Sequence, residues 1–118
     1  MSIIVELRGE AEKEYKRLEA VVNDEKKKGI KNSQNQQLFQ SIQRIADLLK
    51  QDPTYGSQIS KPLLRKTGLP VNNLWIVKLT GYWRLLYTII GNKVEVICYV
   101  LEICDHKKYD KIFGYRKK

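Results

Sequence analysis

Three segments rich in β-branched and aromatic residues follow one another in the second half of the chain, and they constrain its fold more than any other feature. They cover residues 73–80, 82–90 and 93–103 and are separated only by Gly81 and by the pair Gly91-Asn92. A glycine-asparagine pair between two such segments suits a two-residue β-hairpin turn. The pattern therefore predicts a three-strand antiparallel meander.

The first half of the chain predicts one strand and two amphipathic helices. Residues 2–8 are rich in β-branched residues and are typical of a short strand. A charged segment from Gly9 to about Asp24 then predicts a first helix, whose apolar face is formed by Ala11, Tyr15, Leu18 and Val22. After a basic connector at 26–32, Ser33 and Gln36 have the spacing of a capping box. This predicts a second helix that ends at Asp52-Pro53, with the apolar stripe Leu38, Ile42, Ile45 and Leu49.

Prolines and glycines interrupt the stretch between the second helix and the meander. Residues 53–71 contain Gly56, Pro62, Gly68 and Pro70, so we expect a mobile loop with room for only a short helical turn near residues 59–64. After the meander, residues 105–118 include six basic and two acidic residues, a net charge of +4. We expect them to form a short basic C-terminal tail.

The order of these elements predicts an α+β fold, with an N-terminal strand, a two-helix hairpin, the meander and the tail. We expect the helices to cover one face of the antiparallel sheet, and 118 residues suit a single domain, 1–118. Side chains alternate across a strand, which puts the apolar set of each strand under the helices. Lys78 and Arg84 would then lie near each other on the uncovered face, because a short turn around Gly81 joins their strands.

The charge balance favours an anionic partner. The chain has 22 Lys and Arg against 13 Asp and Glu, a net charge of +9, which suits a nucleic acid or an acidic protein. No apolar run is long enough for a signal peptide or a membrane span, so a cytoplasmic protein with no membrane partner is expected. Cys98 and Cys104 lie six positions apart on one predicted strand, about 20 Å by strand geometry, which excludes a disulfide between them. We expect no metal site and no cofactor.

Two segments of the chain resemble the RelE/ParE superfamily of toxins from toxin-antitoxin systems. The segment Lys78-Leu-Thr-Gly-Tyr-Trp-Arg-Leu-Leu-Tyr87 is similar to the family pattern of a lysine-bearing strand, a tight turn and an arginine-bearing strand. The segment His106-Lys-Lys-Tyr109 is similar to its C-terminal motif. The chain departs from the pattern at Ile76, where some members have a second lysine, and at Lys107, where arginine is common. The spacing from His106 to Tyr109 is also shorter.

The resemblance implies a RelE-like fold and a metal-independent mRNA interferase, a hydrolase that cleaves messenger RNA on the ribosome and inhibits translation. By this resemblance Arg84 steadies the scissile phosphate, Lys78 contacts phosphate or assists proton transfer, and Tyr109, or else Tyr115, transfers a proton or stacks on a base. His106 matches the histidine at the head of the family's C-terminal segment. The resemblance also implies a cognate acidic antitoxin as a partner, which agrees with the charge of +9.

The residue types agree with that chemistry. RNA cleavage without metal requires the 2′-hydroxyl to attack the adjacent phosphorus, and an arginine can hold two phosphate oxygens at once. Lys78 could add a second charge or act as the base, while His106 is a natural acid or base and Tyr109 is the alternative. The rings of Tyr82, Trp83 and Tyr109 could stack on bases, and Lys107, Lys108 and Lys111 could contact RNA phosphates.

Two other functions remain open at this point. A ParE-like protein would share the fold and inhibit DNA gyrase without catalysis. A solitary relative would bind RNA or a protein and have no activity, and Ile76 at the position of the second lysine favours keeping this alternative. Singly, a lysine or an arginine on an open strand face is usually a solvated charge. It is the combination of Lys78, Arg84, His106 and Tyr109 with the strand order that favours the nuclease.

Overall fold

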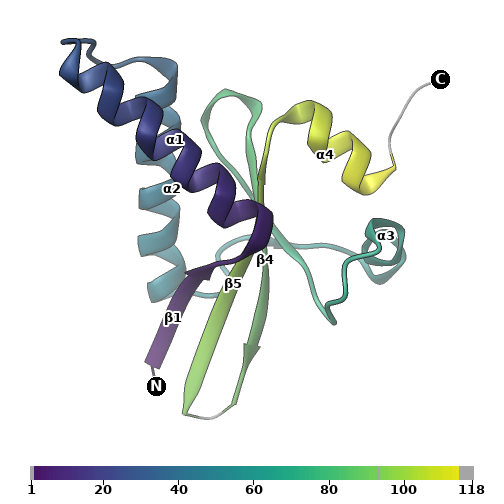
Figure 1. Ribbon diagram of the computed structural model, residues 1–118. Helices are drawn as coiled ribbons and strands as arrows, with labels where there is room; N and C mark the ends of the chain where they lie inside the picture. Colours follow the sequence, from purple (N-terminus) through teal and green to yellow (C-terminus); the bar gives the residue numbers. More distant parts are fainter. Residues whose placement is uncertain (1, 93, 115–118) are drawn as a thin grey trace.

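The computed structural model of the protein describes residues 2–92 and 94–114 and shows an α+β fold with helices on both sides of a five-stranded sheet (Figure 1). The predicted fold class and the order of strand, two helices and meander are confirmed. The strands are β1 (Ser2–Leu7), β2 (Ser57–Gln58), β3 (Trp75–Lys78), β4 (Arg84–Gly91) and β5 (Glu95–Cys104). The helices are α1 (Gly9–Lys27), α2 (Gln34–Gln51), α3 (Lys61–Thr67) and α4 (His106–Phe113), and the 3-10 turn η1 (Thr80–Tyr82) joins β3 to β4.

The sheet has the strand order β1-β5-β4-β3-β2. The meander β3-β4-β5 is antiparallel, as its turn signals predict. The N-terminal strand β1 pairs with β5 in parallel, from Ser2 opposite Glu95 to Leu7 opposite Val100. The two-residue strand β2 pairs with β3 at the other edge. The first strand of the chain is therefore joined to the last.

The helices α1 and α2 form an antiparallel pair that packs on one face of the sheet (Figure 1). The predicted start of α2 is confirmed, because the Ser33 hydroxyl accepts a hydrogen bond of 3.1 Å from the Gln36 N–H. The two helices contact each other through the stacked rings of Tyr15 and Phe39, 5.1 Å apart. Their apolar stripes and one face of the sheet form the main core, which includes Leu18, Val22, Ile42, Ile45, Leu49, Leu85, Tyr87 and Val100. No helix within the described ranges is long and apolar enough to cross a membrane.

The short helical turn expected near residues 59–64 is present as α3, but the expectation of a loop over the rest of 53–71 needs correcting, because β2 joins this stretch to the sheet. Helix α3 begins after Ser60, whose hydroxyl accepts from the Leu63 N–H, and ends at Gly68 with the left-handed φ of 67°. The start of the stretch is attached to the sheet by the Tyr87 hydroxyl. This hydroxyl donates to the Pro53 carbonyl at 2.6 Å and accepts from the Gly56 N–H at 3.1 Å.

The second face of the sheet is covered too, so the prediction that helices lie on one face only needs correcting. A second core forms there between α3, α4 and the sheet, from the buried side chains Leu64, Leu74, Leu86 and Phe113. The basic C-terminal segment is a helix rather than a tail. Its N-cap Asp105 accepts from the Lys108 N–H at 2.9 Å, and Gly114 ends it with φ 73°. Residues 115–118 lie outside the described residues.

The turn between β4 and β5 lies later than predicted. Gly91 is still in β4 and pairs with Val96, and the Asn92 N–H donates to the Glu95 carbonyl at 2.9 Å. The Asn92 side chain closes the turn by accepting from the N–H groups of Val94 and Glu95. A Cβ atom on Gly91 would lie 2.5 Å from the Glu95 carbonyl oxygen. Glycine is therefore needed here for close approach of two strands rather than for the turn itself.

A β-bulge in β5 changes which face its side chains occupy. Leu86 pairs with Glu102 and Tyr87 pairs with Val100, so Leu101 is the extra residue. Cys98 belongs to the main core, whereas Cys104 pairs with Arg84 and lies on the second face. Both cysteines are buried and free.

Candidate functional site

Lys78 and Arg84 are direct neighbours across the sheet. Lys78 ends β3, Arg84 begins β4, and the two are register partners. The prediction that the turn around Gly81 would set them side by side is confirmed. The adjoining face, however, is not uncovered, because α4 packs beside them and contributes Tyr109.

The connection between the two strands is held against α2. It contains η1, in which Gly81 and Tyr82 both have the positive φ of 65°. The Leu79 N–H donates to the Trp83 carbonyl at 2.9 Å, and the Thr80 N–H donates to the Ser41 hydroxyl of α2 at 3.3 Å. The ends of β3 and β4 are thus fixed relative to each other and to α2.

Lys78 and Arg84 line a cavity of about 450 Å³, here called the Arg84 cavity. Four elements contribute to it: the segment that leads into β2, the end of β3, the start of β4, and α4. Its lining residues are Tyr55, Gly56, Ser57, Ile76, Val77, Lys78, Arg84 and Tyr109. Three of the four residues that the sequence suggested as catalytic therefore come together.

The Arg84 guanidinium is positioned by an aromatic ring and a backbone carbonyl. Its central carbon lies 5.6 Å from the centre of the Tyr109 ring, a cation–π contact, and one N–H donates to the Trp83 carbonyl at 3.2 Å. The Tyr109 ring also contacts the ring of Phe113, and the centres of the two rings are 4.7 Å apart. Because Phe113 belongs to the second core, the packing of α4 orients Tyr109 and through it Arg84.

The Arg84 cavity carries positive charge without a compensating acid. No carboxylate lines it, and within residues 2–92 and 94–114 no carboxylate forms an ion pair with Lys78 or Arg84. A guanidinium has five N–H donors, only one of which is used by the Trp83 carbonyl. Two adjacent cations with donors to spare are suited to bind an anion with several oxygens, such as a phosphate diester.

Tyr55 is a member of the site that sequence reasoning missed. It is 47% exposed and lies in the segment that Tyr87 attaches to the sheet. Its ring is an available surface beside the cavity for an unstacked base. The only sequence signal was an aromatic residue between Pro53 and Gly56, and that signal does not indicate which strand the segment contacts.

His106 does not line the Arg84 cavity. It is the first residue of α4, and its side chain is 66% exposed, with Nε2 3.4 Å from the Asp110 carboxylate one turn later. Tyr115, the alternative to Tyr109, lies outside the described residues. The structure thus separates the histidine from the other three candidate residues.

The lysines of α4 differ in their surroundings. Lys107, Lys108 and Lys111 are all exposed. Of the three, only Lys108 forms ion pairs within the described residues, with its ammonium 3.2 Å from a carboxylate oxygen of Glu102 and 3.9 Å from one of Glu10. Burial alone would lower the pKa of Lys108, but its contact with Glu102 and the charges of Glu102 and Glu10 outweigh burial and raise it. Glu102 is only 9% exposed, so Lys108 serves to neutralise a buried carboxylate.

Tyr82 and Trp83 line a second cavity. This cavity, of about 410 Å³, lies between η1 and the first turn of α2 and is here called the Tyr82 cavity. Tyr82 is 77% exposed, while Trp83 is half-buried and packs on the main core. Of the two, Tyr82 is the ring that a base could reach.

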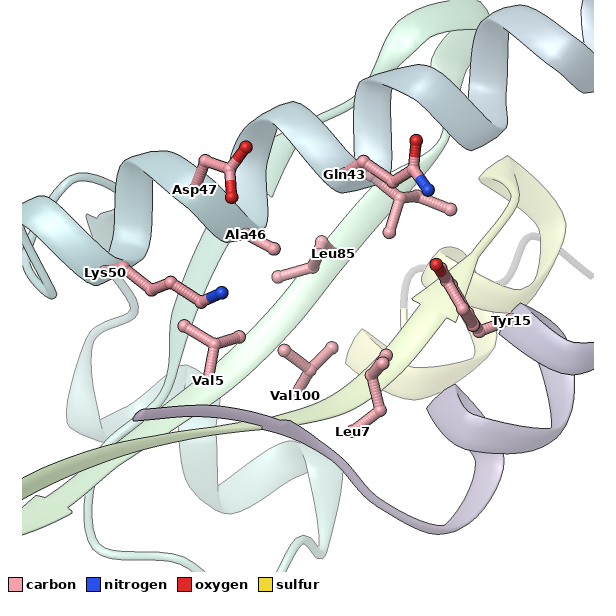
Figure 2. Close-up of a pocket in the computed structure, with 10 residues that line it drawn as sticks. Val5, Leu7, Tyr15, Gln43, Ala46, Asp47, Lys50, Leu85 and Val100 are labelled. Atoms are coloured by element: carbon pink, nitrogen blue, oxygen red, sulfur yellow. The ribbon is translucent and has the colours of Figure 1, made fainter. Parts of the chain in front are cut away.

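A further cavity, of about 430 Å³, is largely apolar and lies on the other face of the sheet, between α1, α2 and β1 (Figure 2). Val5 and Leu7 of β1 and Tyr15 of α1 line it, and Asp47 and Lys50 of α2 are its charged residues. It contains none of the residues suggested by the sequence as catalytic or RNA-binding. Its lining has no pair of side chains suited to phosphate.

The cysteines do not offer a nucleophile. Burial raises the pKa of Cys98 to about 11 and that of Cys104 to about 12, so both thiols keep their protons at neutral pH. Across the part of the chain that the structure describes, no three His, Cys, Asp or Glu side chains are grouped so that they could hold a metal ion.

Comparisons with protein-family models, curated proteins and solved structures gave no match to this chain. Function has to be inferred from the Arg84 cavity and its chemistry.

Proposed function

We propose that the protein is an endoribonuclease that cleaves messenger RNA in the Arg84 cavity, as a toxin of the RelE type. The observation that carries this proposal is the pairing of Lys78 with Arg84 across two strands, beside Tyr109 and without any carboxylate in the lining. Such a site attracts anions, and a phosphate diester is an anion that its paired lysine and arginine can hold through several oxygens. A single-stranded substrate is favoured by the exposed ring of Tyr55 at the same cavity.

The proposed reaction needs no group from outside the RNA as nucleophile. The 2′-hydroxyl oxygen forms a bond to the adjacent phosphorus, and the bond from phosphorus to the 5′-oxygen breaks. A base takes the proton of the 2′-hydroxyl, and an acid gives a proton to the leaving 5′-oxygen. The products are a 2′,3′-cyclic phosphate and a free 5′-hydroxyl.

Arg84 and Lys78 would stabilise the extra negative charge of the pentacoordinate phosphorus. The guanidinium is already oriented by Tyr109 and the Trp83 carbonyl, so little reorganisation is needed when the charge develops. Lys78 adds a second positive charge from the facing strand. Arginine suits the first role because its planar fork can hold two phosphate oxygens.

Tyr109 is the proposed proton donor to the 5′-oxygen. Its ring already contacts Arg84 and Phe113, which leaves base stacking to Tyr55 rather than to Tyr109. His106, at the start of α4, does not line the cavity and lies instead beside Asp110, so we assign it no part in the reaction. The lining has no strong base, which favours cleavage on the ribosome, where the decoding site would help to orient the 2′-hydroxyl.

The test is cleavage of messenger RNA on programmed ribosomes by the purified protein, with the new ends mapped by primer extension. Replacing Arg84 with alanine is expected to lower the cleavage rate about 100- to 1,000-fold, the usual loss when a transition-state donor is removed. Arg84→Lys should recover only a small part of this rate, because lysine lacks the fork. Circular dichroism and thermal unfolding check that each variant is folded.

His106→Ala is the matched control, because it changes a motif residue that lies outside the cavity. We expect it to cleave at nearly the rate of the unchanged protein. Normal cleavage by Arg84→Ala would overturn the assignment of the site. An intact message combined with inhibition of gyrase supercoiling would favour the ParE-like function, and binding without either activity would favour the solitary relative.

We also propose an acidic antitoxin as the partner that silences the enzyme, in the cytoplasm, where ribosomes translate. The net charge of +9 and the uncompensated cations of the Arg84 cavity support this choice. An acidic segment over Lys78 and Arg84 would exclude RNA. An acidic polypeptide that binds the purified protein should abolish cleavage in the ribosome assay, and cleavage that continues unchanged while it is bound would contradict this mode of silencing.

A further inference from the structure

A polar cleft of about 470 Å³ lies beside the Arg84 cavity, between α2 and the end of β3. The contribution of α2 is the row Gln37, Gln40, Ser41 and Arg44. The spacing of these residues is i, i+3, i+4 and i+7, so they form one stripe along the helix. All four are polar, in contrast to the apolar stripe that α2 turns to the main core.

The cleft adjoins the two cavities described above, with which it shares lining residues. Lys78 lines both the Arg84 cavity and the cleft. Gln37 and Thr80 line both the cleft and the Tyr82 cavity. A path therefore leads from Arg84 past Lys78 and Arg44 to the exposed ring of Tyr82.

Between Lys78 and Tyr82, the group on this path best suited to bind an anion is the guanidinium of Arg44. Its side chain is exposed, and among the described residues it has no ion pair and no hydrogen bond. The cleft has no acidic lining residue, and Asp47, one turn further along α2, lines the apolar cavity instead. Gln40 presents an amide that can donate to and accept from a base edge.

We propose that this cleft is a second substrate subsite, in which Arg44 binds a phosphate next to the scissile one. The RNA strand runs from the Arg84 cavity across Lys78 into the cleft. Gln40 contacts the nucleotide bound there, and Tyr82 stacks on the following base. The inference rests on the proposed endoribonuclease function and extends it, because it assigns the direction in which the substrate leaves the reaction centre.

The test uses RNA oligonucleotides of the mapped cleavage sequence, with a 2′-O-methyl group at the cleavage site so that they bind without reacting. In a series of these, each phosphate linkage in turn is replaced by a neutral methylphosphonate. Fluorescence anisotropy at a series of salt concentrations measures the dissociation constant for the unchanged protein, Arg44→Ala and Arg84→Ala. Arg65→Ala is the matched control, because Arg65 is an exposed arginine on α3 that lines neither cavity nor cleft.

Arg44→Ala should weaken binding of unmodified RNA about tenfold, as expected for one charge-assisted phosphate contact, and lower the salt slope by about one. With the RNA that is neutral at one linkage beside the cleavage site, Arg44→Ala should bind as tightly as the unchanged protein. Arg84→Ala should instead match the affinity of the unchanged protein with the RNA that is neutral at the scissile linkage. Arg65→Ala should change affinity much less.

Four results would overturn the subsite. Unchanged affinity of Arg44→Ala, while Arg84→Ala loses affinity, would refute the subsite and leave the proposed function standing. A loss in Arg44→Ala that is the same for every modified RNA would indicate general charge attraction. An effect of Arg44→Ala on binding of the protein partner but not of RNA would assign the cleft to that partner. If the unchanged protein bound and cleaved no RNA, the proposed function would fail and the subsite with it.

Discussion

The hydroxyl of Tyr87 joins the segment before β2 to the sheet, and its removal is the sharpest test of how the Arg84 cavity is built. Tyr87→Phe deletes one oxygen atom and leaves the ring in the main core. The Gly56 N–H and the Pro53 carbonyl then each lose a partner, at 3.1 and 2.6 Å. This segment carries Tyr55, so these two hydrogen bonds, together with the pairing of β2 with β3, hold one wall of the cavity.

The expected loss of stability follows from those two groups. A buried polar group that loses its partner costs about 1–3 kcal/mol, and both backbone groups belong to half-buried residues that water can partly reach. We therefore expect Tyr87→Phe to lower the free energy of unfolding by about 2 kcal/mol. With an unfolding entropy of about 2.1 cal/mol/K per residue, the 118 residues give about 0.25 kcal/mol per degree. The melting temperature should fall by about 8 °C.

The same hydroxyl predicts a pH dependence with a definite sign. Burial raises the pKa of Tyr87 from its ordinary value of 10 to about 12. Between these values the unfolded chain releases a proton that the folded protein keeps, so stability falls as the pH rises. The contribution is complete below pH 10 and is lost as the pH rises through 12. At pH 11 the difference between the unchanged protein and Tyr87→Phe should therefore shrink by about 1.4 kcal/mol.

Urea unfolding at pH 8 and at pH 11 measures both effects. Tyr82→Phe is the control, because it deletes the hydroxyl of a side chain that is 77% exposed and should change stability by less than about 0.5 kcal/mol. Equal stability of Tyr87→Phe and the unchanged protein at pH 8 would refute the reasoning. A difference that stays constant from pH 8 to pH 11 would refute the part that concerns ionisation.

Two further substitutions probe the same region. Gly56→Ala would bring a Cβ atom to 2.8 Å from the Ile76 carbonyl oxygen, so we expect a loss of about 1–3 kcal/mol in urea unfolding; an equally stable variant would contradict the close packing. Lys108→Ala leaves the Glu102 carboxylate buried without its cation and should cost about 2 kcal/mol, whereas Glu102→Leu should cost less than 1 kcal/mol and should rescue Lys108→Ala. Equal losses for the two single variants in thermal unfolding would contradict this asymmetry.

The parts of the fold that sequence could predict are those fixed by local chemistry. Ser33 caps α2 because its hydroxyl reaches an N–H three residues later, and apolar spacing defines the face that α2 buries. The pairing of Lys78 with Arg84 follows from a short connection between two strands. These features depend on residues close together in the sequence, and all of them are confirmed.

The sequence contains capping signals for α3 and α4, but each segment is too short for these signals to predict a stable helix. Ser60 and Gly68 bracket α3, and Asp105 and Gly114 bracket α4, as caps should. Both helices are short, with seven and eight residues, and short helices are marginal without tertiary contacts. They form because Phe113 and its partners bury a second core, which is not visible in either segment alone.

The site was predictable only in part, because some of its residues meet only through contacts between distant elements. Tyr109 joins Arg84 because α4 packs on the second face, and the same helix turns His106 to solvent. Tyr55 reaches the Arg84 cavity through a contact between Tyr87 and Pro53, 34 residues apart. Arg44 lines the adjoining polar cleft because η1 docks on α2. Contacts of this kind depend on the completed sheet.

The parallel pairing of β1 with β5 affects how the protein folds during its synthesis. Ser2 pairs with Glu95, so β1 is synthesised long before the strand that it pairs with. Until then β1 has no neighbour in the sheet, and Arg84 has not met the helix that follows β5. Such long-range pairing slows folding, because a large loop must close before the contacts form. A nascent chain that stops before β5 therefore has neither a finished sheet nor a formed Arg84 cavity, and the cavity is complete only after α4, which follows β5, has also been made.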